Sequence, residues 1–154
     1  MPDQPLHPEA RAFVALGFDA AWSTGLWAAS WSKSLEGLTP EQAAWSPGAG
    51  RHSIWQQVLH MVFWRENVLR RLETGERYTE EEIEALNWPE IAEVTQEAWE
   101  EAKARFRDTQ RRVLAGLRSA EPKYDVLTSF LPHDCYHFGM INAIRATLGL
   151  RAIE

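Results

Sequence analysis

The sequence predicts an all-α protein, a bundle of four long helices in a single domain that spans residues 1–154. Two observations predict this fold. Apolar residues recur at the spacing of an amphipathic helix in four long stretches, and no stretch shows the alternation of a half-buried strand. A helix can bury an apolar stripe only against other helices, and 154 residues are enough to build one core.

The first predicted helix begins near Pro8 and continues through two tryptophans to Leu35, with Gly37 just beyond its end. Proline suits the first position of a helix, and glycine suits the position after the last turn. A short helical turn should follow, because Thr39 can cap it and Gln42 can return a hydrogen bond to the cap. Residues 46–50, Ser-Pro-Gly-Ala-Gly, should form a loop.

Ser53 is the expected cap of the second long helix, which should reach about Glu73. Residues 80–89 then form a connection with room for one helical turn, and a third helix follows. Its stripe is Trp99, Ala102, Phe106, Val113 and Leu117. The fourth helix should stop at Gly149, and it begins either near Pro132 or near Asp125 with a kink at that proline.

Composition and charge exclude several classes of function. Lys and Arg number 16 against 22 Asp and Glu, for a net charge of −6, and the basic residues are scattered, so nucleic-acid binding is disfavoured. No apolar run is long enough to span a bilayer. The single cysteine, Cys135, cannot form an intramolecular disulfide, and the first residues do not form a signal peptide. We therefore expect a cytoplasmic protein that does not bind membranes.

Three histidines are the candidate metal ligands. His133 and His137 are four positions apart, so on a helix both project from one face and can share an ion. His60 is the best third donor, because it lies on a flank of its helix away from the apolar stripe. The alternatives are a chance pair on an ordinary helix and a solvated His60. His7 and His52, in the N-terminal tail and a glycine-rich loop, are left out.

The neighbours of the histidines have two interpretations each. Asp134 is either a surface charge or a hydrogen-bond acceptor for a ligand, and Cys135 is expected to be a small core residue. Trp64 and Tyr136 either line a cleft beside the ion or pack between helices. Glu66 points to another face of its helix than His60, so it is expected on a charged surface rather than as a catalytic base.

Three imidazoles would form a neutral site that suits one divalent ion, Zn²⁺, Ni²⁺ or Fe²⁺, with further coordination positions open to water or substrate. Such an ion lowers the pKa of bound water to about 7 or binds a thiol as its thiolate. Either reaction produces a nucleophile without a dedicated base.

The segments LTPEQAAWSP at 38–47, SIW at 53–55, LH at 59–60 and HDCYHFG at 133–139 resemble the DinB/YfiT family. The resemblance covers nearly the whole chain, to Gly149. It implies an up-down-down-up four-helix bundle, commonly dimeric, that binds a divalent cation through His60, His133 and His137. One departure is Met140, where family members often have glutamine, which removes a polar neighbour of the site.

The resemblance extends to bacillithiol-type transferases and mycothiol-dependent isomerases, so the first hypothesis is an enzyme that activates a low-molecular-weight thiol and transfers it to a small-molecule substrate. A metal-dependent hydrolase that uses bound hydroxide is the second hypothesis. The third is a non-catalytic, stress-related metal-binding bundle. A homodimer is expected, because Trp22, Trp27 and Trp31 are more than one core can hide.

Overall fold

The structure is a computed structural model that describes residues 5–25 and 27–153. Within these residues all regular structure is helical, which confirms the all-α prediction. The elements are α1 (Pro8–Ser23), α2 (Trp31–Leu35), α3 (Pro40–Ala44), α4 (Ile54–Thr74), α5 (Glu80–Asn87), α6 (Gln96–Arg118), a 3₁₀ helix (Pro122–Ser129) and α7 (Phe130–Thr147). None of the described helices is both long and apolar enough to cross a bilayer.

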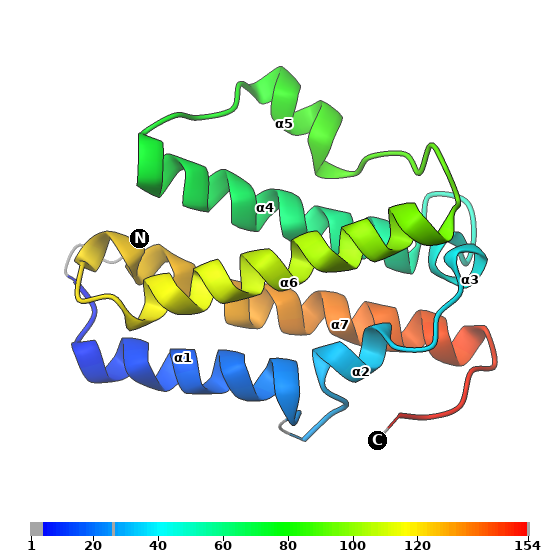
Figure 1. The fold of residues 1–154 in the computed structure, drawn as a ribbon, viewed down its shortest axis with the longest axis horizontal. Coiled ribbons are helices and arrows are strands. Elements are labelled where there is room, and N and C mark those ends of the chain that lie inside the picture. The colour runs from blue at the N-terminus through cyan, green and yellow to red at the C-terminus, as the bar shows by residue number, and fades with distance from the viewer. Residues whose placement is uncertain (1–4, 26, 154) are drawn as a thin grey trace.

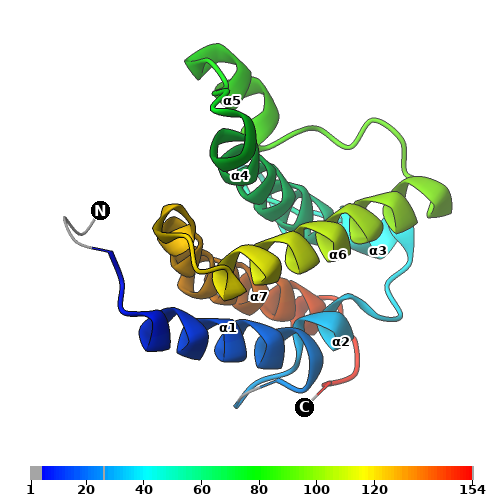
Figure 2. The ribbon, with the colours of Figure 1, turned by 60° about the vertical axis from the view of Figure 1, so that its left-hand side comes forward.

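The four long helices pack around one another. Helix α6 contacts both α1 and α4, and α7 contacts the same two helices. In Figure 1, α1 and α7 run from left to right, whereas α4 and α6 run in the opposite direction. Helix α5 lies beyond α4, on the side away from α1, in both Figure 1 and Figure 2. The long helices therefore enclose the interior, and α5 covers α4 from outside.

Side-chain caps explain where α3, α4 and α5 begin. Thr39 and Gln42 exchange hydrogen bonds with each other's backbone N–H groups at the start of α3, and Ser53 and Gln56 do the same at α4. The expected caps at Thr39 and Ser53 are confirmed. A third capping box, at Thr79, begins α5, which has two turns instead of the single turn expected from the sequence.

The predicted stripe of α6 is buried along its whole length, and so are most apolar residues of α4. The tryptophans of the first predicted helix are distributed unevenly. Trp31 is buried against Phe18 and Phe138, Trp22 is half-buried, and Trp27 is fully exposed. The interior therefore accommodates one of these three rings completely.

The prediction of one continuous helix from Pro8 to Leu35 is wrong, because α1 ends at Ser23 and α2 begins only at Trp31. Gly25 has a φ of 71°, and its N–H donates to the carbonyl of Ala20, which closes α1. Ser30 then caps α2 through the N–H of Lys33. The apolar spacing continues across this break, so spacing alone did not reveal it.

Helix α7 begins at Phe130, directly after the 3₁₀ helix. Pro132 is therefore the third residue of the helix, where its missing N–H would have no partner within the helix. Of the two predicted starts, the one near Pro132 is confirmed. Gly149, with a φ of 70°, follows the end of α7 as expected.

Gly25→Ala is expected to lower the free energy of unfolding by at least about 2 kcal/mol, because a left-handed conformation disfavours a side chain and adds to a steric clash. The new Cβ would lie 2.2 Å from the carbonyl oxygen of Ala28. Urea unfolding measures the change. Gly48→Ala is the matched control: a Cβ there meets no atom within 4 Å, so a loss as large as that of Gly25→Ala would contradict this account.

Candidate metal centre

The structure brings the three predicted ligands together. His60 lies on α4, and His133 and His137 lie one turn apart on α7. Each offers one nitrogen, and these three atoms lie within 4.8 Å of one another. His60 is 7% exposed and His137 5% exposed, so neither is the solvated surface residue that was the alternative for His60.

Each imidazole is held through its Nδ1 atom by a different acceptor. The Nδ1–H of His60 donates to the carbonyl oxygen of Asn87 at 3.1 Å. That of His133 donates to Asp134 Oδ1 at 2.8 Å, and that of His137 donates to Gln57 Oε1 at 2.5 Å. A carbonyl or carboxylate oxygen can only accept, so Nδ1 carries a proton, and in the neutral ring Nε2 then has a free lone pair.

The free Nε2 atoms fit a shared cation. Those of His133 and His137 are 3.2 Å apart, and two lone pairs at this separation repel each other unless a cation lies between them. Nitrogens bound to one Zn²⁺ at about 2.0–2.1 Å in tetrahedral geometry are about 3.3 Å apart. An imidazole whose other nitrogen donates to a carboxylate or carbonyl is also the usual arrangement of a metal-binding histidine. The donor set can therefore hold a divalent metal ion.

A buried ion pair fixes the position of His133. Asp134 is completely buried, and its Oδ2 accepts hydrogen bonds from Nε and Nη2 of Arg65 at 3.0 and 2.6 Å. Its other oxygen, Oδ1, faces the histidine. Arg65 is also completely buried and lies on α4, whereas His133 and Asp134 lie on α7. Of the two interpretations of Asp134, the structure supports the hydrogen-bond acceptor and excludes the surface charge.

The segment after α5 covers His60. Trp88 stacks on the His60 ring at 3.8 Å and, on its other face, on the His52 ring at 3.7 Å. Trp64 Nε1 donates to Asn87 Oδ1 at 2.8 Å, and Gln56 Nε2 donates to the carbonyl oxygen of Pro89 at 3.2 Å. These bonds hold residues 87–89 against α4. The segment predicted as a connection therefore forms one wall of the site.

A small cleft of about 160 Å³ opens beside His137. Its walls include Trp88, Tyr136 and Met140, and its polar groups include Arg51 and His52. Tyr136 therefore lines the cleft, which is one of the two interpretations given for it above. Trp64 is not among the lining residues and instead holds Asn87. No Asp or Glu lines this cleft in the described part of the chain, which leaves His52 as a base beside the predicted ligand.

Two further expectations have clear outcomes. Cys135 is exposed, so the prediction of a small core residue is wrong: its position on α7 faces away from the neighbouring helices. Glu66 pairs with Arg105 of α6 at 2.8 Å on the surface, as expected. His52 was left out because a glycine-rich loop gives no periodic signal, and the structure places it next to the site.

Burial keeps His60 and His137 neutral. It lowers the pKa of His60 to about 4, an effect that the hydrogen bond to Asn87 opposes and nearby His133 reinforces. Burial likewise lowers the pKa of His137 to about 4, together with the charges of His133 and His60. Neutral imidazole is the form that binds a metal, so these ligands are ready to bind at neutral pH.

Comparison with known proteins gives one match. The model of the DinB superfamily matches residues 26–143, more than half of the chain. The matched range includes all three histidines. No curated protein and no solved structure matches the sequence.

Asp134→Asn is expected to cost about 3–5 kcal/mol of stability, because it leaves the buried Arg65 guanidinium without a countercharge. It should also weaken divalent metal binding about 10–100-fold, because His133 loses its carboxylate acceptor. Urea unfolding and zinc titration measure the two effects. Glu66→Gln, which removes an exposed ion pair of α4, is the control and should cost no more than about 1 kcal/mol. Equal effects of the two changes would contradict the role given to Asp134.

The metal-free protein is expected to lose stability as the pH falls from about 6.5 to about 4. In this window unfolded histidines, with an ordinary pKa of 6.5, take up protons that folded His60 and His137 do not bind. The contribution is complete above pH 6.5 and decreases as the pH falls toward the folded pKa. Urea unfolding at pH 7 and pH 5 with a chelator measures it. A double variant, His60→Gln with His137→Gln, should show a smaller decrease, and an unchanged decrease would rule out these two groups as its source.

Proposed function

The chain belongs to the DinB superfamily, and we propose that it is a metal-dependent enzyme that activates a low-molecular-weight thiol and transfers it to an electrophilic substrate. One observation carries the proposal. The Nδ1 atoms of His60, His133 and His137 are all bonded to protein acceptors, so three Nε2 lone pairs are directed to one place beside a cleft.

These three nitrogens would hold one divalent ion, and Zn²⁺, Ni²⁺ and Fe²⁺ all suit imidazole ligands. Such an ion, when bound, favours the thiolate over the thiol at neutral pH. The protein contributes the placement of the ligands. Asp134, Gln57 and the Asn87 carbonyl hold the rings in position, and they keep each Nε2 unprotonated.

The cleft favours a small, partly apolar substrate. Trp88, Tyr136 and Met140 provide apolar surface that excludes water from the reacting atoms. Arg51 lines the same cleft and can pair with a carboxylate of the thiol or of the substrate. Attack of a thiolate on an electrophile requires no proton donor at the start, which agrees with a cleft that has no acidic side chain among the described residues.

A metal-dependent hydrolase is the second candidate, and His52 is the observation that favours it. His52 lines the cleft, and burial lowers its pKa, so the ring is neutral near pH 7 and can accept a proton from water. A metal-dependent hydrolase can use such a base on the attacking water, and the protonated ring can then give the proton to the leaving group. A thiol transferase does not depend on His52, so the effect of His52→Ala on the two activities distinguishes these candidates.

We also propose the up-down-down-up topology for the bundle. In this topology α4 and α6 run in one direction, and α1 and α7 run in the opposite direction. The directions of these helices in Figure 1 and the packing of α6 and α7 on both α1 and α4 support it.

Protein purified without an affinity tag is expected to contain about one divalent ion per chain by elemental analysis, and His137→Ala should contain none. The metal-loaded protein should consume thiol in the presence of an electrophile, and His137→Ala should lose this activity, because the Nε2 donor is gone. His7→Ala removes an exposed histidine of the N-terminal segment and is the matched control.

Equal rates for the parent protein and His137→Ala, across several thiols and electrophiles, would reject the thiol-transferase proposal. Ester or amide hydrolysis without thiol, lost in His52→Ala, would establish the hydrolase instead. If chelation lowers the melting temperature and neither activity is found, the metal has a structural role.

A further inference from the structure

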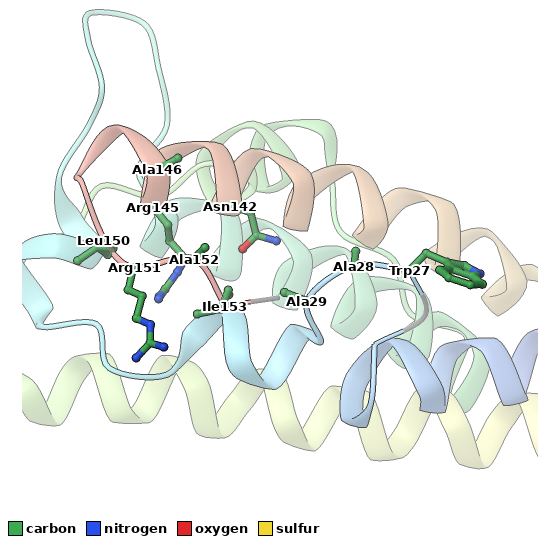
Figure 3. A pocket seen from close by; sticks show the side chains of 10 residues that line it. All are labelled: Trp27, Ala28, Ala29, Asn142, Arg145, Ala146, Leu150, Arg151, Ala152 and Ile153. Atoms are coloured by element: carbon green, nitrogen blue, oxygen red, sulfur yellow. The ribbon is translucent and has the colours of Figure 1, made fainter.

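A second pocket lies on the other side of α7 from the histidines. Its volume is about 600 Å³, and it is lined by the end of α7, residues 27–29 before α2, and residues 150–153 after α7. Figure 3 shows Arg145 and Asn142 projecting from α7 on the side where Ala29 and Ile153 lie. The pocket shares no lining residue with the histidine cleft, so it is a separate site.

Arg145 is the unusual residue of this pocket. It is 8% exposed, yet none of the ion pairs among the described residues includes it. Its Nη1 donates to the carbonyl oxygens of Ser34 and Glu36, both at 3.2 Å, which supports the end of α2. Its Nε is buried without a hydrogen-bond acceptor in the described part of the chain. A buried cation with an unused donor is costly unless an anion approaches it.

The guanidinium keeps one terminal donor for a ligand. Nη1 is engaged by carbonyls and Nε is buried, so Nη2 is the donor that remains for a carboxylate oxygen in the pocket. Arg151 lines the same pocket and is exposed, so it adds positive charge where a ligand would enter.

The remaining wall is apolar. Trp27, Leu150 and Ile153 line the pocket together with several alanines. Trp27 lies at the far end from Arg151 in Figure 3. A strongly hydrated anion such as phosphate would gain nothing from this surface, whereas an apolar chain would be removed from water by it. The volume lies within the range of pockets that hold small organic ligands.

We propose that this pocket binds an amphiphilic monocarboxylate, with the carboxylate on Nη2 of Arg145 and the apolar chain along Leu150 and Ile153. The site is independent of the metal and of the thiol chemistry proposed above. Its ligand is defined by two properties: a single carboxylate and an apolar body of moderate length.

Octanoate is the probe, and calorimetric titration of the chain of residues 1–154 is the measurement. Octanoate should bind, whereas 1-octanol, which has no carboxylate, and inorganic phosphate, which has no apolar chain, should bind at least about tenfold more weakly. Arg145→Gln should weaken octanoate binding about tenfold or more. Arg118→Gln, which changes an exposed arginine of α6, is the control and should bind like the parent.

A second variant covers the case in which Arg145→Gln fails to fold because the carbonyls of Ser34 and Glu36 lose their donor. Ala146→Trp leaves the guanidinium in place and fills the pocket from an exposed position of α7, so it should also abolish binding. The proposal is overturned if octanoate does not bind, if octanol binds equally well, or if both variants bind like the parent.

Two other occupants of the pocket give distinct results. A parent protein that sediments as a dimer and becomes monomeric in Ala146→Trp would assign the pocket to a contact between two copies of the chain. Residue 154 lies outside the described residues. If octanoate binds Glu154→Gln and does not bind the parent, the Glu154 carboxylate, rather than a ligand, is the partner of Arg145. Either result would overturn the proposal.

Discussion

The buried ion pair of Arg65 and Asp134 is the interaction on which both the bundle and the histidine site depend. Both side chains have no exposed surface. The guanidinium lies over the ring of Phe106 at 4.2 Å and over that of Phe18 at 5.1 Å, and Nη1 donates to Thr109 Oγ1. One arginine of α4 therefore contacts α1, α6 and α7. The same carboxylate that neutralises this charge orients His133, so the packing of the core and the geometry of the site are not separable.

The parts of the site that follow a helical period could be predicted from the sequence, and the others could not. His133 and His137 share a face by their spacing, and His60 was identified by its distance from the apolar stripe of α4. The loop residue His52 and the linker residue Trp88 follow no helical period, so spacing did not point to either of them. The acceptors that hold His60 and His137 lie 27 and 80 positions away in the chain, and spacing along one helix does not specify such contacts. The acceptor of His133 is its neighbour Asp134, which the sequence offered as one of two interpretations.

The fold, too, could be predicted where the signal is local and not where contacts between helices decide. The capping residues Thr39 and Ser53 act within four positions, so the sequence predicts the starts of α3 and α4 correctly. The break between α1 and α2 was missed because apolar residues continue at helical spacing on both sides of it. Ser23, Thr24 and Gly25 form a recognisable helix end, but the later glycine at position 37 was an equally good stop. Local signals compete, and contacts with the other helices decide between them.

The sequence left the start of helix α7 open because of Pro132, and the helix also has polar groups on two sides. His133 and His137 face α4, where Gln57 holds one ring, while Asn142 and Arg145 face the pocket beside α2. A helix whose buried positions include a histidine, an aspartate and an arginine cannot have the single apolar stripe from which helices are recognised. Buried polar groups cost stability unless they are paired, so each buried polar side chain of α7 needs a hydrogen-bond or charged partner. The histidines and Asp134 pair with one another and with α4, and Arg145 donates to the carbonyl oxygens of Ser34 and Glu36.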